Sequence, residues 1–336
     1  MESIDVHSHI VIESWFDNVR KDFPEAVPKL EREESTGLYS ILASGKDSST
    51  TKHVPETITN VPKRIKHLEK LKISLQLIAP IPSLLFHDQP FETAIALTRA
   101  QNDGMAQLSK ENPDIFSCLC SIPLQNPQEA LPELERAVNH LGLKGVEIPT
   151  NINGMNLDDR SLWPFYAKVQ ELGVPMMVHP INIGAANRLQ KYYLSNLIGN
   201  PLDTSIAIAS VIFGGVLKEF PKLKFFFVHG GGFTPFQRGR LEHGFKVRPE
   251  PKENISNNPM SYLRLIHVDT IVHYAPALDY LIRTMGANNV LLGSDYPFDM
   301  GPRDPVGEMK EVKLSQEDRK KINSENARKL FRLGKR

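Results

Sequence analysis

Short apolar runs rich in Ile, Val, Leu and Phe recur along the chain, and longer segments with helical spacing separate most of them. Buried strands of a parallel sheet are apolar on both faces, so this alternation is typical of repeated strand–helix units. The runs lie at residues 3–10, 72–82, 116–124, 144–150, 174–180, 223–232, 263–270 and 289–298. Eight units in 336 residues predict an α/β fold, a (β/α)8 TIM-type barrel formed by residues 1–336 as a single domain.

Segment 126–142 illustrates the helical pattern between two runs, since Pro127 opens it, apolar residues recur at three and four positions, and Gly142 closes it. Residues 11–60 do not fit the pattern, because they are polar, contain proline and show little periodicity, with 43–57 predicted as loop. A long segment after the first strand indicates either a lid-like functional insertion or a disordered surface insertion. The sequence leaves both open.

Composition narrows the class of protein. The chain carries 40 basic and 39 acidic residues, so it lacks the positive field that a nucleic-acid partner requires. No apolar stretch reaches the roughly 20 residues of a membrane span, and the N-terminus is acidic where a signal peptide would be basic. We therefore expect a cytoplasmic protein without a membrane partner. Cys118 and Cys120 would face the same side of a strand, which predicts buried free thiols.

Metal-binding residue types stand at the ends of the apolar runs. His7 and His9 end the first run, His179 the fifth, His229 the sixth and Asp295 the eighth. Active sites of such barrels lie at the C-terminal ends of the strands, so we expect all five side chains at one mouth. Residues i and i+2 share a face of a strand, so the first two imidazoles form a clamp. Imidazoles with one carboxylate are typical ligands of a catalytic divalent metal such as Zn²⁺.

We assign no metal-binding role to the other histidines. Four are interpreted as surface residues of loops or helices: His53, His67, His87 and His140. Three could lie nearer the mouth and receive no role: His243, His267 and His273.

Four motifs in this order carry a resemblance: "DVHSH", "VHP", "FVHGGGFTPFQRGRLEHGF" and "GSDYPF". The chain resembles the amidohydrolase superfamily and, more narrowly, aminocarboxymuconate semialdehyde decarboxylase and related nonoxidative decarboxylases of aromatic acids. The resemblance implies one divalent metal, most often Zn²⁺ and sometimes Mn²⁺. Its ligands would be His7, His9, His179 and Asp295.

The resemblance also implies roles around this metal. His229, with Asp295, would serve catalysis, the histidine by activating water or handling the substrate proton. Arg240 would reach the neighbouring subunit's site and bind a substrate carboxylate, which implies a homodimer. Phe298 would form an aromatic wall of the pocket. By themselves, Arg240 is typical of a surface helix and Phe298 of a core.

Two positions depart from the family pattern. Lys52 stands where the relatives place a second carboxylate-binding arginine, and an ammonium cannot form the bidentate fork of a guanidinium. Asn196 stands where they place an aromatic pocket residue. Both residue types are also ordinary in loops. Because these differences concern residues that would contact the substrate, the resemblance predicts the type of reaction better than it predicts the substrate.

The resulting hypothesis is a metal-dependent nonoxidative decarboxylase of a conjugated or aromatic carboxylic acid, acting on a small anionic substrate. The same ligands could instead serve hydrolysis of a lactone or amide, and Glu147 in the fourth run could then bridge a second metal. A noncatalytic barrel with a structural metal is a third alternative, although a closed structural site would leave His229 without a role.

Overall fold

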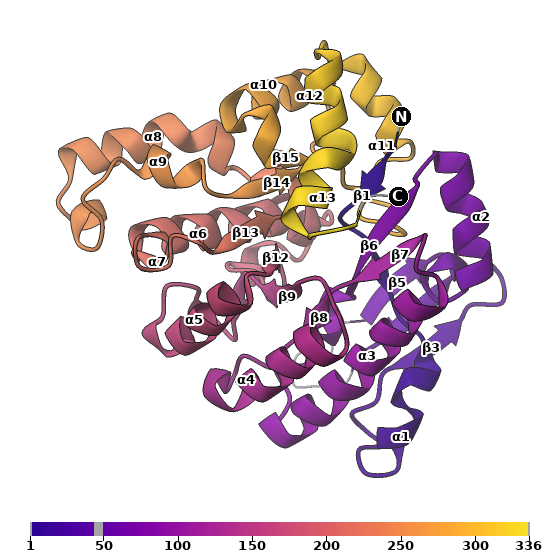
Figure 1. Cartoon of the computed structure of the whole chain (residues 1–336). Helices are drawn as coiled ribbons and strands as arrows, with labels where there is room; N and C mark the ends of the chain where they lie inside the picture. The colour runs from indigo at the N-terminus through magenta and orange to yellow at the C-terminus, as the bar shows by residue number, and fades with distance from the viewer. Residues whose placement is uncertain (1, 44–49, 335–336) are drawn as a thin grey trace. The chain divides into compact units, whose positions relative to one another are not determined.

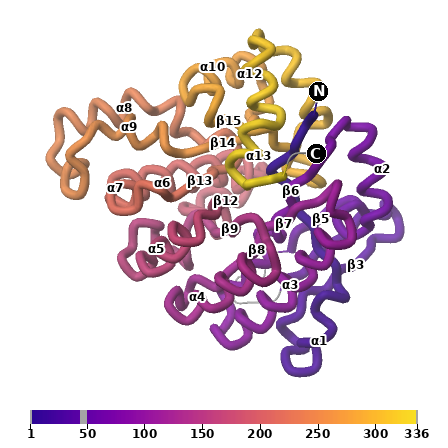
Figure 2. Tube along the Cα trace, in the orientation of Figure 1, coloured from indigo at the N-terminus to yellow at the C-terminus, as the bar shows by residue number. Residues whose placement is uncertain are grey.

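The computed structural model describes residues 2–43 and 50–334, and the chain divides into two compact units. Residues 1–147 and 292–310 form the first unit, whereas residues 148–291 and 311–336 form the second. Figures 1 and 2 trace the chain through both units. That the chain forms a single domain stays a prediction.

In its described residues, the first unit contains parallel strands, a separate antiparallel sheet and five α-helices. Its strands are β1 (Ile4–Asp5), β2 (His9–Ile10), β3 (Lys29–Arg32), β4 (Tyr39–Leu42), β5 (Thr50–Val54), β6 (Leu75–Pro80), β7 (Phe116–Cys118), β8 (Cys120–Ser121) and the first half of β9 (Val146–Pro149). Its helices are α1 (Asp17–Arg20), α2 (Val61–Leu71), α3 (Phe91–Glu111), α4 (Pro127–Glu135) and α11 (Pro305–Glu308).

Strand β6 is the centre of the parallel sheet in this unit, because β1, β2 and β7 all pair with it. The register with β6 changes between β1 and β2, because Asp5 pairs with Gln76 whereas His9 pairs with Ala79. The segment from β1 to β2 therefore has one residue more than the stretch of β6 opposite it. Such a bulge re-aims side chains and is common near active sites. It lies at residues 6–8 and so includes His7.

The insertion after the first strand is folded where the structure describes it. Strands β3, β4 and β5 form an antiparallel sheet, and its side chains join a buried apolar cluster. The cluster contains Val11, Phe16, Val27, Ile41, Val54, Ile58, Ile81, Leu84, Phe86, Ala94 and Leu97. The alternative of a disordered insertion is therefore wrong for residues 11–43 and 50–60. The prediction of loop over 43–57 is also wrong at β5, while residues 44–49 lie outside the described chain.

The second unit has parallel strands with helices between them and, in addition, an antiparallel pair formed by β10 and β11. Its strands are the end of β9, then β10 (Asn151–Ile152), β11 (Met155–Asn156), β12 (Pro175–His179), β13 (Lys224–Phe227), β14 (His267–Asp269) and β15 (Val290–Leu291). Its helices are α5 (Trp163–Leu172), α6 (Asn200–Phe213), α7 (Val216–Glu219), α8 (Thr234–Val247), α9 (Pro259–Leu263), α10 (Ala275–Met285), α12 (Gln316–Lys320) and α13 (Asn326–Leu330).

Strands β12, β13, β14 and β15 lie side by side in the second unit, each parallel to the next (Figure 2). Phe225, Phe226 and Phe227 of β13 are fully buried, as expected for a parallel strand covered on both faces. The C-terminal ends of these strands therefore point in one direction within the unit.

Each of the eight predicted runs contains a strand. The third run is split into β7 and β8 because it changes partner: β7 pairs with β6, and β8 pairs with β9. The predicted helix at 126–142 is α4, which continues as a π-helical turn over Arg136–His140 before Gly142 adopts φ +74°.

Two composition-based expectations can be compared with the structure. Cys118 and Cys120 are buried free thiols, as predicted. Among the residues that the structure describes, no helix combines the length and apolarity that crossing a membrane requires.

Candidate active site

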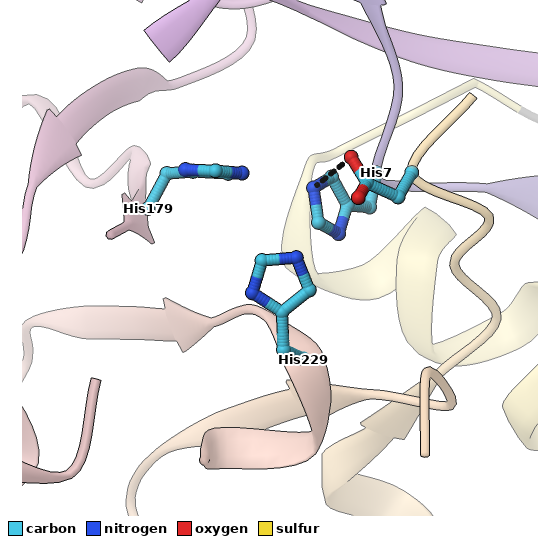
Figure 3. A group of neighbouring side chains, drawn as sticks. His7, His179 and His229 are labelled. Atoms are coloured by element: carbon cyan, nitrogen blue, oxygen red, sulfur yellow. Dashed lines mark ion pairs between the residues drawn. The ribbon is translucent and has the colours of Figure 1, made fainter. Parts of the chain in front are cut away.

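Three donor atoms of the first unit form a compact triangle. His7 lies in the bulge between β1 and β2, His9 begins β2, and Asp295 follows β15 in the returning segment. The Nε2 atoms of His7 and His9 lie 3.2 Å apart. Asp295 Oδ1 lies 3.3 Å from the first and 3.4 Å from the second; Figure 3 draws the His7–Asp295 ion pair as a dashed line.

These separations fit a shared cation. A tetrahedral site with N and O ligands at about 2.0–2.1 Å has edges of roughly 3.3–3.4 Å. His9 Nδ1 lies 2.7 Å from the carbonyl oxygen of Pro80, which only accepts, so Nδ1 carries the proton and donates. His9 Nε2 therefore presents its lone pair to the triangle, which is the tautomer that binds a metal.

Burial prepares His9 for this role. The ring is fully buried, and burial lowers its pKa, an effect that Asp295 partly opposes. A neutral imidazole binds a metal without first releasing a proton. Thus both the tautomer and the charge state of His9 suit a metal ligand.

Asp5 is hydrogen-bonded to the residues that flank the triangle. Its carboxylate accepts hydrogen bonds from Gln76 Nε2 at 2.7 Å, from Ser294 Oγ at 2.5 Å and from the backbone N–H of His7 at 3.2 Å. Burial raises the pKa of Asp5, although these three donors oppose the rise. The carboxylate thereby ties the chain around His7 to the residue that precedes Asp295.

The segment that carries Asp295 is held against the first strand. The backbone N–H of Val6 donates to Leu292 O at 2.9 Å, and that of His9 donates to Tyr296 O at 2.7 Å. Asp295 itself adopts φ +54°, a left-handed conformation that costs free energy for a residue with a side chain. The hydrogen bonds to the first strand thus hold this conformation, and with it the direction of the Asp295 carboxylate.

Glu147 is a second carboxylate of the first unit, at the end of its part of β9. It is fully buried, and neither carboxylate oxygen has a hydrogen-bond partner among the described residues. Burial raises its pKa well above the ordinary value, while His7 favours and Asp295 disfavours its charged form. A buried carboxylate in this state requires a proton or a cation as its partner.

The second unit contains two imidazoles of interest, His179 and His229, both labelled in Figure 3. His179 ends β12, and its Nδ1 lies 3.0 Å from Pro180 O, so Nδ1 carries the proton and Nε2 is the unprotonated nitrogen. The ring of His229 packs edge-on against it, with ring centres 5.2 Å apart. The chain after β13 turns sharply at His229, where φ is +54°. The two rings therefore present nitrogen atoms on the same side of this unit.

Asp269 fixes the turn at His229. From the end of β14, its Oδ2 accepts the backbone N–H of His229 at 3.0 Å, and its Oδ1 accepts those of Gly230 at 2.8 Å and Ile271 at 3.1 Å. These bonds compensate for the left-handed backbone at His229. Asp269 is fully buried and determines where the His229 ring lies.

The other predicted site residues lie as follows. Phe298 is half-buried, with its ring centre 5.5 Å from that of His9, and it also packs against the apolar cluster of the insertion. Lys52 is exposed on β5, and Asn196 is half-buried in a π-helical turn, Ser195–Gly199. Arg240 is exposed on α8. The roles predicted for all four stay predictions.

The interpretation of His87 as a surface residue is wrong. It is only 7% exposed, because the chain after β6 folds back beside the insertion's apolar cluster. Burial lowers its pKa to about 3.

Sequence reasoning missed the polar residues that support the site. Asp5, Gln76 and Asp269 each interrupt an apolar run, and each is fully buried. A polar residue within a run whose neighbours are all buried must find partners inside the protein. That interruption was the available signal. Arg64 lies on α2 and offered no comparable signal.

The chain matches a known protein family over nearly its whole length. The profile of the amidohydrolase family matches residues 4–333. The chain is 34% identical over 318 residues to 2-amino-3-carboxymuconate-6-semialdehyde decarboxylase of Dictyostelium discoideum, covering 94% of this chain and 88% of that protein. The family predicted from the four motifs is confirmed.

Solved structures confirm the fold class. The 5-carboxyvanillate decarboxylase of Sphingomonas paucimobilis aligns over 99% of both chains, with a TM-score of 0.82 and 22% identity. Dihydroxybenzoic acid decarboxylase from Polaromonas, solved with bound manganese and 2-nitroresorcinol, aligns over 100% of this chain and 98% of that one. Its TM-score is 0.79 at 21% identity. The α/β barrel predicted from the eight runs is therefore correct.

Proposed function

The chain belongs to the amidohydrolase family, and we propose that it is a metal-dependent nonoxidative decarboxylase of a conjugated or aromatic carboxylic acid. The observation that carries this proposal is the His7–His9–Asp295 triangle, whose sides suit a divalent ion, in a chain related over nearly its whole length to a decarboxylase. A carboxy-lyase is favoured over a hydrolase because two relatives that align with 94% and 98% of this chain carry decarboxylase names.

We propose that one divalent ion is held by His7, His9, His179 and Asp295. Each can offer one ligand atom, and the tautomers of His9 and His179 leave Nε2 as that atom. The nitrogen-rich donor set favours Zn²⁺, while the manganese in the Polaromonas structure makes Mn²⁺ the alternative. When bound, a divalent ion acts as a Lewis acid toward oxygen atoms of the substrate.

The protein's own side chains would guide the proton and the substrate. Loss of CO₂ leaves an electron pair on the substrate carbon, which must take up a proton before or after the bond breaks. His229 is our candidate for delivering that proton, since Asp269 holds its backbone in place. Three neutral imidazoles and one carboxylate leave a divalent centre with net positive charge, which favours an anionic substrate.

The substrate shell is proposed to include Phe298, Lys52, Asn196 and an Arg240 supplied by a partner subunit. Phe298 offers a ring face beside His9, suited to a planar conjugated substrate. Arg240 lies one helical turn after Phe236, which is 44% exposed, so α8 presents an apolar side chain and a cation on one face. This supports the proposal of a homodimer. We also place the protein in the cytoplasm, where free thiols persist.

The test is CO₂ release from metal-loaded protein given muconate semialdehydes and hydroxylated aromatic acids. Metal-stripped protein and His229→Ala are the controls, and the variant should bind metal without turnover. CO₂ that depends on metal supports the proposal. Silence across the panel, with hydrolysis of lactones or amides by the same protein, would replace it with the hydrolase alternative. Metal loss without unfolding excludes a purely structural metal.

Metal content decides the role of Glu147. One metal per chain is expected for the decarboxylase, whereas two per chain would make Glu147 a ligand of the second ion and favour the hydrolase.

Subunit mixing tests Arg240. If this residue serves the partner's site, inactive Arg240→Ala and inactive His229→Ala should regain activity when mixed, because the mixed dimer has one complete site. No recovery from verified mixed dimers would assign Arg240 to its own subunit.

A further inference from the structure

Arg64 is a fully buried cation in the first unit, on helix α2. Its Nε donates to Gln76 Oε1 at 2.8 Å, and its Nη1 donates to the carbonyl oxygen of His9 at 2.6 Å. The guanidinium carbon lies 4.8 Å from the ring centre of Tyr296. Burial lowers the pKa of Arg64 to about 10. No carboxylate within ion-pair distance of Arg64 is found in the described part of the chain.

A buried charge without a direct counterion is costly, and an apolar side chain of similar volume would normally pack there more favourably. Apart from Thr57 O, 3.5 Å from Nη1, and the Phe116 ring, 6.0 Å from the guanidinium carbon, Arg64 has three contacts that explain its presence. Each of the three falls on a residue that sets a proposed metal ligand. The first is His9 itself, and the second is Tyr296, the residue after Asp295. The third runs through Gln76, which donates to Asp5, the carboxylate that holds the His7 backbone and Ser294.

We propose that Arg64 is a positioning residue for the metal site, holding the His7–His9–Asp295 triangle at the separations a metal requires. The inference rests on the proposed metal function. The guanidinium hydrogen-bonds the His9 carbonyl and packs against the Tyr296 ring, so it contacts both chain segments that carry the donors. Through Gln76 it is also linked to Asp5, which hydrogen-bonds the His7 backbone and Ser294. The fork geometry is essential, because Nε and Nη1 address two acceptors at a fixed angle. A lysine ammonium could satisfy only one of them at a time.

The test separates metal affinity from stability. Arg64→Met, Arg64→Lys and Gln76→Met would be titrated with Mn²⁺ and Zn²⁺ by calorimetry with a competing chelator, alongside thermal unfolding of the metal-free proteins. The matched control is Arg136→Met, which removes an arginine that bonds Glu133 and Asp103 in the same unit without contacting the donors. We expect metal Kd to rise 10- to 100-fold in the Arg64 and Gln76 variants and to stay within twofold in Arg136→Met. The electron paramagnetic resonance spectrum of bound Mn²⁺ should broaden in the Arg64 and Gln76 variants but not in Arg136→Met.

Each outcome of these titrations supports or refutes the positioning role of Arg64. If Arg64→Met does not fold, Arg64→Lys and Gln76→Met keep smaller perturbations of the same contacts. A lower melting temperature with unchanged metal Kd in both would make Arg64 a structural residue and overturn the proposal. Wild-type protein that binds no metal would refute the proposed function, and this inference with it. Wild-type protein that binds metal and releases CO₂, beside variants with unchanged Kd, would refute only the positioning role.

Discussion

Acidification should destabilise this protein through His87, a buried imidazole outside the metal site. Burial holds its pKa at about 3 in the folded chain, against 6.5 for an unburied imidazole. The folded protein therefore keeps His87 neutral while the unfolded chain takes up a proton as pH falls through 6.5. Because the unfolded state binds more protons, stability is present above that pH and is lost progressively toward pH 3.

The magnitude follows from this difference. Between pH 7.5 and 5.0 the folded side chain does not titrate, so the loss equals the free energy of protonating the unfolded imidazole, about 2 kcal/mol. Asp5 and Glu147 act in the opposite direction, since burial raises their pKa values and acid then favours the folded form. The His87 contribution must therefore be measured as a difference between proteins.

The assay is urea unfolding of wild type and His87→Gln at both pH values, with His140→Gln as the control, because His140 is exposed. Glutamine keeps a donor for the backbone of Ile122, which the imidazole bonds. The free energy of unfolding of wild type should fall by about 2 kcal/mol more than that of His87→Gln over this pH range. Equal changes in these two proteins would show that His87 is protonated or solvated in the folded state and would refute this prediction.

Three further predictions concern residues of the site and its scaffold. Asp295→Asn should lower metal affinity at least about 10-fold by calorimetry while circular dichroism stays unchanged, since asparagine tolerates φ +54°; undiminished affinity would remove Asp295 from the ligands. Asp269→Asn should lower kcat by roughly 10-fold or more with little change in KM, because it displaces His229; an effect on KM alone would contradict this. Gly232→Ala should cost at least about 2 kcal/mol of stability, because its Cβ would lie 2.2 Å from Pro201 O. The control Gly239→Ala, in open space on α8, should be neutral or stabilising in the same urea titration.

The strands could be predicted from the sequence because buried parallel strands are continuous apolar runs, as Phe225–Phe227 shows. The sheet of the insertion could not, because β3 and β5 are short and largely exposed, so their residues show neither alternation nor a continuous apolar run. The bulge at residues 6–8 depends on pairing with β6, which no local pattern encodes.

The donors of the site were suggested by residue type and strand-end position, and their assignment as ligands stays a prediction. The residues behind them were missed for a different reason. Arg64 is an ordinary residue of an amphipathic helix until Gln76 and the His9 carbonyl lie beside it, 12 and 55 positions away in sequence. Such contacts depend on tertiary packing. The burial of His87 cannot be predicted from the sequence for the same reason, since it comes from the folded insertion.

The left-handed backbone at His229 and Asp295 has a consequence for directed evolution of this protein. At both positions φ is +54°, where glycine would be conformationally easier than either residue. A library ranked only by thermal stability would therefore enrich glycine at both places and lose the imidazole and the carboxylate. Any selection for a more robust variant has to include turnover at every round, because stability and chemistry make opposite demands on these two residues.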